Sequence, residues 1–116
     1  MNEVENTIPV IPVSDLHHSI EFYTGVLGFV LDWGGAEGEA ICSVSRGGHC
    51  IMLRVEPEPL APSCVWIGLE SDRLFSEYAD KGVTVLQEPE NHPWAYDMKI
   101  QDPDGNVLWL GTAPRA

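Results

Sequence analysis

The chain has 116 residues, 44% of them hydrophobic, which is enough for one domain with a buried core. Acidic residues outnumber basic ones by 18 to 6, giving a net charge of −12, which argues against nucleic acid as a partner because such binding depends on neutralising phosphates. No apolar run approaches the ~20 residues of a membrane span. The N-terminus is polar and acidic, unlike a secretory signal, and we expect a cytoplasmic protein with no membrane partner.

The acidic balance and the cysteines each have two interpretations. The charge either keeps the protein soluble or attracts a cationic ligand, and taken alone it favours solubility. Cys42, Cys50 and Cys64 are odd in number, form no C-x-x-C motif and lie in apolar runs. We therefore expect reduced, buried cysteines rather than disulfides or a zinc site.

The first half predicts a strand, a helix and further strands. Residues 7–13 favour a strand, and their prolines restrict it to a sheet edge or an irregular ladder. Ser14-Asp15 offers an N-cap for a helix whose apolar residues recur at helical spacing. These are Leu16, Ile20, Tyr23 and Leu27. A strand begins at 29–33, and a hairpin joins 40–45 to 50–55.

A proline-rich connector at 57–62 leads into a second half that repeats this plan about 56 residues later. Its elements are a strand at 63–69, a helix capped by Ser71-Asp72, a strand at 83–87, a loop at 88–93 and a closing hairpin. We predict an α+β fold in one domain, 1–116, with module one at about 7–56 and module two at about 63–113. Each helix covers the outer face of its half, and the remaining strand faces form a curved mixed sheet around a cup.

The closing hairpin turns on Asp102-Pro103-Asp104-Gly105-Asn106. Pro103 fixes φ for the second turn position and Gly105 supplies a positive φ, which permits the chain to reverse. The next strand begins with four apolar residues, 107–110, so we expect both of its faces to be buried, one under a helix and the other toward a core or a cavity.

The turn and the first helix together resemble the vicinal oxygen chelate superfamily, which includes glyoxalase I, extradiol dioxygenases and bleomycin resistance proteins. The resemblance rests on Pro12-Val13-Ser14-Asp15-Leu16, Ser19-Ile20-Glu21-Phe22-Tyr23, Val26-Leu27-Gly28-Phe29 and the Asp102–Asn106 turn. It covers nearly the whole chain and implies paired βαβββ modules, a homodimer, and a pocket at or near the subunit interface.

Enzymes of that superfamily hold a divalent metal with His, Glu or Gln side chains. The matching positions here are Ile8, Met52 or Leu53 depending on register, Cys64, and Trp109. None is a histidine or a carboxylate, so we expect neither a metal nor a cofactor. Whether the protein is an enzyme stays open, but the apolar residues at these metal-binding positions argue against catalysis.

Without a metal, the chain is most similar to the bleomycin resistance branch, whose members bind a cationic antibiotic without reacting with it. Asn91-His92-Pro93-Trp94-Ala95 resembles a loop of that branch in which the tryptophan stacks on the ligand, although Ala95 stands where the branch tends to have glycine. Cys64-Val65-Trp66-Ile67 resembles its tryptophan-rich strand. Aromatic faces attract planar cations by stacking and cation–π contact.

The candidate ligand-binding residues also have structural interpretations. Trp66 can be a core residue, whereas Trp94 lies in a polar loop, and Trp109 either lines or fills the cup. Arg54 favours an anionic ligand if it points inward and is a solvated strand residue if it points outward. The remaining candidates that we expect to contact the ligand are Met52, Tyr96 and Asp32.

We therefore expect a protein that binds a small molecule without catalysis and sequesters a cationic antibiotic. The alternative is a metal-dependent lyase or dioxygenase of the glyoxalase superfamily with non-standard ligands. A third interpretation is a structural or partner-binding dimer, in which Trp66 and Trp109 fill the cup.

Overall fold

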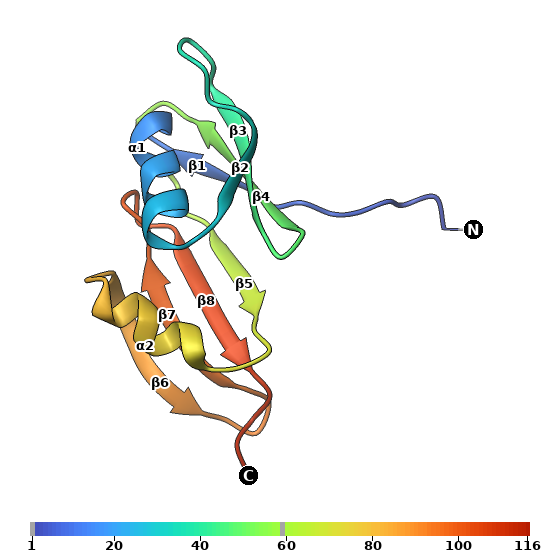
Figure 1. Ribbon diagram of the computed structural model, residues 1–116, viewed down its shortest axis with the longest axis vertical. Coiled ribbons are helices and arrows are strands. Elements are labelled where there is room, and N and C mark those ends of the chain that lie inside the picture. Colours follow the sequence, from blue (N-terminus) through green and yellow to red (C-terminus); the bar gives the residue numbers. More distant parts are fainter. Residues whose placement is uncertain (1, 59) are drawn as a thin grey trace. The chain divides into compact units, whose positions relative to one another are not determined.

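The computed structural model describes residues 2–58 and 60–116, and the chain divides into two compact units, Met1–Leu60 and Ala61–Ala116. Each unit holds one four-stranded mixed sheet and its own helix, in the order strand, helix, three strands (Figure 1). The predicted α+β class and the paired βαβββ modules are confirmed. The cup enclosed by the modules and the single domain stay predictions.

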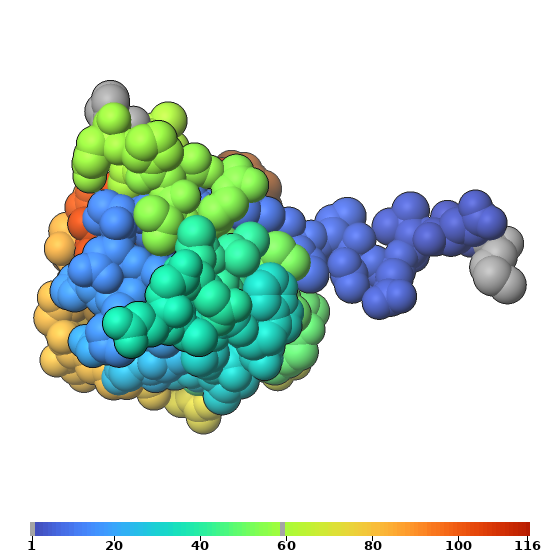
Figure 2. Space-filling view, turned by 90° about the horizontal axis from the view of Figure 1, so that it is seen from above, coloured from blue at the N-terminus to red at the C-terminus, as the bar shows by residue number. Residues whose placement is uncertain are grey.

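The first sheet has the strand order β1-β4-β3-β2, with β1 parallel to β4 and the other pairs antiparallel. Its elements are β1 (Val10–Val13), α1 (Leu16–Glu21), the π-helical turn η1 (Phe22–Val26), β2 (Val30–Gly34), β3 (Ile41–Arg46) and β4 (His49–Val55). Residues 2–9 run extended away from the sheet of their unit (Figure 2). The strand predicted from residue 7 thus begins only at Val10, after Pro9.

Asp15 caps α1 as predicted, because its carboxylate accepts a hydrogen bond from the backbone N–H of His18 at 3.1 Å. The expected single helix changes to π-helical geometry at Phe22, and Tyr23 and Leu27 remain buried. Alternating residues of the sheet complete this core, including Ile11, Val13, Val44 and Leu53.

The second sheet has the order β5-β8-β7-β6, with β5 parallel to β8. Its elements are β5 (Cys64–Gly68), α2 (Arg73–Asp80), β6 (Thr84–Asn91), β7 (Tyr96–Gln101) and β8 (Val107–Thr112). The loop predicted at 88–93 is wrong over most of its length, since β6 continues to Asn91 with irregular register. Pro89 is tolerated because β6 is an edge strand, where a missing N–H breaks no ladder.

Helix α2 lies across one face of this sheet and buries Phe75 and Tyr78 (Figure 1). The predicted Ser71-Asp72 cap forms in part: Ser71 Oγ accepts a hydrogen bond from the backbone N–H of Arg73 at 3.4 Å, whereas the carboxylate of Asp72 makes no capping hydrogen bond and pairs with Arg115. The face beneath α2 is apolar and buried, with Met98, Ile100, Leu108 and Leu110.

The Asp102–Asn106 turn holds the start of β5 as well as the hairpin. Asp102 Oδ1 accepts hydrogen bonds from the backbone N–H groups of Asp104 and Asn106, each at 2.9 Å. The side chain of Asn106 donates to Asp102 and accepts from the backbone N–H of Ser63 at 2.8 Å. Gly105 has φ of 86°, the left-handed conformation predicted for it.

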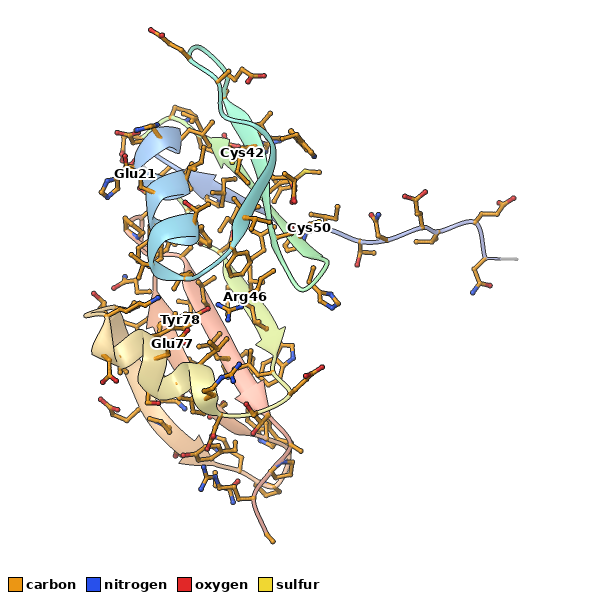
Figure 3. The ribbon with its side chains drawn as sticks, viewed as in Figure 1. Glu21, Cys42, Arg46, Cys50, Glu77 and Tyr78 are labelled. Carbon is orange, nitrogen blue, oxygen red and sulfur yellow. The ribbon has the colours of Figure 1, made fainter. Side chains whose placement is uncertain are left out.

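The three cysteines are free, and only Cys42 is buried. Cys42 on β3 faces α1, whereas Cys50 on β4 pairs with Ser45 and is partly exposed (Figure 3). Cys64 at the start of β5 is exposed, so the expected burial is wrong for this residue. Within the described ranges, no helix is both long enough and apolar enough to cross a membrane.

Candidate functional site

The second sheet presents a face of tryptophans on the side away from α2. Tyr96 contacts Phe75 of α2 at a ring-centroid distance of 5.4 Å, so the alternation along β7 turns Asp97 and Lys99 to the opposite face. Trp109 pairs directly with Lys99 across β7 and β8. We call this surface the tryptophan face; it comprises Trp66, Trp94 and Trp109 with His92, Asp97 and Lys99.

Asp97 anchors the tryptophan face and is only 1% exposed. Its Oδ2 accepts the indole Nε1–H of Trp109 at 2.6 Å, a short, charge-assisted hydrogen bond. Its Oδ1 accepts from Nε2 of Gln87 at 2.8 Å and lies 3.1 Å from Nε2 of His92. Both carboxylate oxygens are therefore satisfied, which a buried carboxylate requires.

The environment of Asp97 keeps this buried carboxylate charged. Burial pushes the pKa of Asp97 upward. Hydrogen bonds from Trp109 and Gln87 lower it, as do the charge and the hydrogen bond of His92. Together these contacts outweigh burial and hold the pKa below its ordinary value. The tryptophan face therefore has a fixed negative charge beneath its aromatic surface.

Trp109 lies at the centre of a row of three indoles. Its ring centroid is 5.1 Å from that of Trp66 and 5.5 Å from that of Trp94, and both contacts are edge-to-face. The outer two rings remain open to solvent, with Trp66 47% and Trp94 56% exposed. Neither exposed indole belongs to the core, so the structural interpretation of Trp66 as a core residue does not describe its position.

The loop carrying Trp94 is held at both ends by the C-terminal tail. Inside the loop, the ring of His92 stacks on Trp94 at 4.7 Å and 6°. At one end, the Asn91 side chain exchanges two hydrogen bonds with the backbone of Arg115. At the other end, the Arg115 guanidinium lies 4.0 Å from the ring centroid of Tyr96 and reaches Asp72. Arg115 therefore positions the loop without touching the tryptophan face.

Replacing Arg115 by alanine is expected to loosen this loop. The change removes one cation–π contact and one exposed ion pair, so the amide of His92, which donates to Ala95, should exchange about tenfold faster. Hydrogen exchange followed by NMR measures this rate. Arg73→Ala, which removes an exposed arginine from α2, is the matched control, and equal exchange rates in both variants would contradict the role of Arg115.

The other predicted ligand-binding residues are not among those that make up the tryptophan face. Tyr96 lies on the α2 side of the sheet, opposite the tryptophan face. Met52, Arg54 and Asp32 belong to the first module. Met52 rather than Leu53 lies on the face away from α1, because Leu53 is fully buried with the α1 core.

Asp32 lies at an irregularity of β2 and shares the face of Met52. Its carboxylate accepts from Ser45 Oγ at 2.7 Å and Ser43 Oγ at 3.2 Å. Arg54 is exposed and forms an ion pair with Glu56 at 2.7 Å, and strand alternation puts it on the same face of β4 as Met52.

Sequence reasoning missed the residues beneath the indoles. The expected site residues did not include Asp97, Lys99 and His92, which contact Trp109 or Trp94. They also did not include Gln87, which donates a hydrogen bond to Asp97. The alternation of Asp97 and Lys99 with apolar residues along β7 is the signal that could have found them, because charged side chains on one face of a covered strand indicate a polar function there.

With this geometry established, comparison with known proteins gives the family. The model of the Glyoxalase/Bleomycin resistance protein/Dioxygenase superfamily matches residues 6–110. The chain belongs to this superfamily. The resemblance inferred from the sequence motifs is confirmed. A search of curated proteins finds no significant match.

Solved structures of this superfamily's fold resemble the chain over nearly its whole length. TnmS3, an antibiotic-binding protein from Streptomyces sp. CB03234, is 26% identical with a TM-score of 0.77, covering 97% of this chain and 98% of its own. TioX from Micromonospora sp. ML1 is 17% identical with a TM-score of 0.80, covering 95% and 99%. Integron cassette protein HFX_CASS4, from the mobile metagenome of Halifax Harbour sewage outfall, is 22% identical with a TM-score of 0.81, covering 94% and 99%.

The residues at the superfamily's metal-binding positions do not fit a metal. Of Ile8, Met52, Cys64 and Trp109, only the thiol of Cys64 is an ordinary metal ligand. The indole of Trp109 donates its N–H to Asp97 and offers no lone pair. Among residues 2–58 and 60–116, no three His, Cys, Asp or Glu side chains gather as a metal site would require. We therefore derive no metal-dependent step.

Proposed function

We propose that this protein binds a planar, cationic small molecule on its tryptophan face and does no chemistry on it, sequestering an antibiotic of this kind. The observation that carries the proposal is the row of indoles fixed to the buried carboxylate of Asp97, with Trp66 and Trp94 left open to solvent. The likeness to TnmS3, described as an antibiotic-binding protein, supports the same ligand class. Our proposal puts this activity in the cytoplasm.

The physics of the face favours a flat cation. Indole faces attract planar rings by stacking and cations through their quadrupole. Asp97 adds a fixed negative charge below the rings, and Glu90 Oε2 lies 3.8 Å from His92 at their edge. The net charge of −12 accelerates the encounter with a cation at low salt.

Asp97 also argues for binding over catalysis. A general base needs a free lone pair and a pKa close to the working pH. Asp97 has its oxygens occupied by donors from Trp109, Gln87 and His92, and its pKa is held below the ordinary value. This carboxylate orders and charges the face, and it is a poor acceptor of a substrate proton.

Calorimetric titration with proflavine, a planar cation, tests the proposal, with bleomycin and an anionic naphthalene sulfonate as comparators. We expect saturable binding of the cations and little binding of the anion. Trp94→Ala should weaken proflavine binding about tenfold, the effect of one stacking and cation–π contact.

Arg73→Ala is the control, because it removes a large exposed side chain from α2, on the other side of the second sheet. It should leave the affinity unchanged within about twofold. Absence of saturable binding by either cation, or equal losses in the Trp94 and Arg73 variants, would contradict the proposal.

We also propose that the chain is a homodimer, as the superfamily resemblance implies. The exposed apolar side chains of β2, Val30, Leu31 and Trp33, are a surface that a second copy can cover. Sedimentation at micromolar concentration should give about twice the 12.8 kDa of one chain. A species with the mass of a single chain would contradict the dimer.

A further inference from the structure

Lys99 already occupies the aromatic surface that a cationic ligand would use. Its ammonium nitrogen lies 5.1 Å from the centroid of the Trp109 ring, within the range of a cation–π contact. Lys99 and Trp109 are direct neighbours across β7 and β8, so the lysine is tethered beside the ring. Over the described part of the chain, no carboxylate lies within ion-pair distance of Lys99, which leaves the indole as its partner.

The carboxylate of Asp97 strengthens this contact. A hydrogen bond from the Trp109 Nε1–H to a charged oxygen, here 2.6 Å long, draws electron density toward the ring and makes its face more negative. The ring is therefore an improved site for a cation, and its present occupant is a side chain of the same protein.

We propose that Lys99 is the specificity-determining residue of the tryptophan face, acting as a tethered competitor of the ligand's cationic group. This inference rests on the proposed function. A ligand must displace the Lys99 ammonium from the Trp109 ring. An alkylammonium ligand gains little from this exchange, because it makes the same kind of contact with the ring as the lysine that it displaces. A planar cation with a delocalised charge gains stacking on Trp66 or Trp94 as well. Lys99 therefore selects aromatic cations over alkylammonium ions.

Replacing Lys99 by glutamine tests this role. The variant frees the Trp109 ring, so proflavine should bind about fivefold more tightly than to the wild type. Arg73→Gln is the matched control, because it removes the same charge from α2 on the other side of the sheet and should change the affinity by less than about twofold. Lys99→Arg keeps a cation at the position and should retain the wild-type affinity within about twofold.

The outcomes separate this inference from the proposed function. If the wild type does not bind proflavine, the proposed function itself fails. If the wild type binds but Lys99→Gln and Arg73→Gln behave alike, the competitor role is overturned while the binding function stands. Weaker binding by Lys99→Gln also overturns it, since Lys99 would then be a contact of the ligand.

Discussion

Replacing Asp97 by alanine should lower the free energy of unfolding by about 3 kcal/mol, because three donors lose a buried, charged acceptor. The side chains left without it are Trp109, Gln87 and His92. The cost of leaving a donor without an acceptor is smaller for His92, because its side chain is partly exposed and water can replace the lost carboxylate. Urea denaturation at pH 7 measures the change. A loss no greater than that of Asp80→Asn, an exposed carboxylate of α2, would contradict the anchoring role of Asp97.

The pH dependence of Asp97→Asn separates the charge from the hydrogen bonds. Because the folded-state pKa of Asp97 lies below its unfolded value, its ionisation stabilises the fold above the unfolded pKa of about 3.9. That contribution disappears as the pH falls through the folded pKa. The stability gap between wild type and Asp97→Asn should therefore be widest near pH 7 and narrow below about pH 4. A gap that stays constant down to pH 3 would contradict the lowered pKa.

Substituting Gly111 by alanine should have the largest effect on ligand binding among the small changes available. Gly111 lies under the ring of Trp66, and a Cβ placed there would lie 2.8 Å from Cζ3 and closer still to Cη2. Real side chains do not approach so closely, so the indole must leave its position against Trp109. We expect proflavine affinity to fall about tenfold, with a stability change below about 1 kcal/mol because Trp66 can move into solvent.

Gly68→Ala provides a matched control for this substitution. Gly68 pairs with Gly111 in the β5–β8 ladder, and a Cβ there would meet only Nε1 of Trp66, at 3.4 Å. The Gly68 variant should bind proflavine nearly as tightly as the wild type, within about twofold. Equal affinities for the two variants would show that the position of Trp66 does not matter to binding.

The sequence predicted the modules well because their signals are local. The cap of Asp15 and the positive φ of Gly105 depend on neighbouring residues alone, and both occur as predicted. Trp109 could be selected as a candidate site residue because it follows the Asp102–Asn106 turn at a fixed spacing in the sequence. Local signals also gave a wrong prediction: Pro89 indicated a loop at 88–93, whereas β6 continues through this proline because it is an edge strand.

The contact between Gln87 and Asp97 could not be predicted because it depends on register between strands. Gln87 lies on the same face as Asp97 only because the β6–β7 pairing shifts between Val85 and Gln87, which places Gln87 opposite Lys99. Tyr96 was expected to contact the ligand, but strand alternation turns it to the α2 side of the sheet. Its partner there, Arg115, comes from a tail that no motif had marked.

The indole N–H resonances of the four tryptophans test the central claim most directly. Each tryptophan gives one such signal in an ¹⁵N–¹H spectrum, so one titration with proflavine reports on all of them separately. Binding on the tryptophan face predicts saturable shifts for Trp66, Trp94 and Trp109, each larger than the shift of Trp33. Shifts of Trp33 alone, equal shifts of all the signals, or no saturable shift would contradict it.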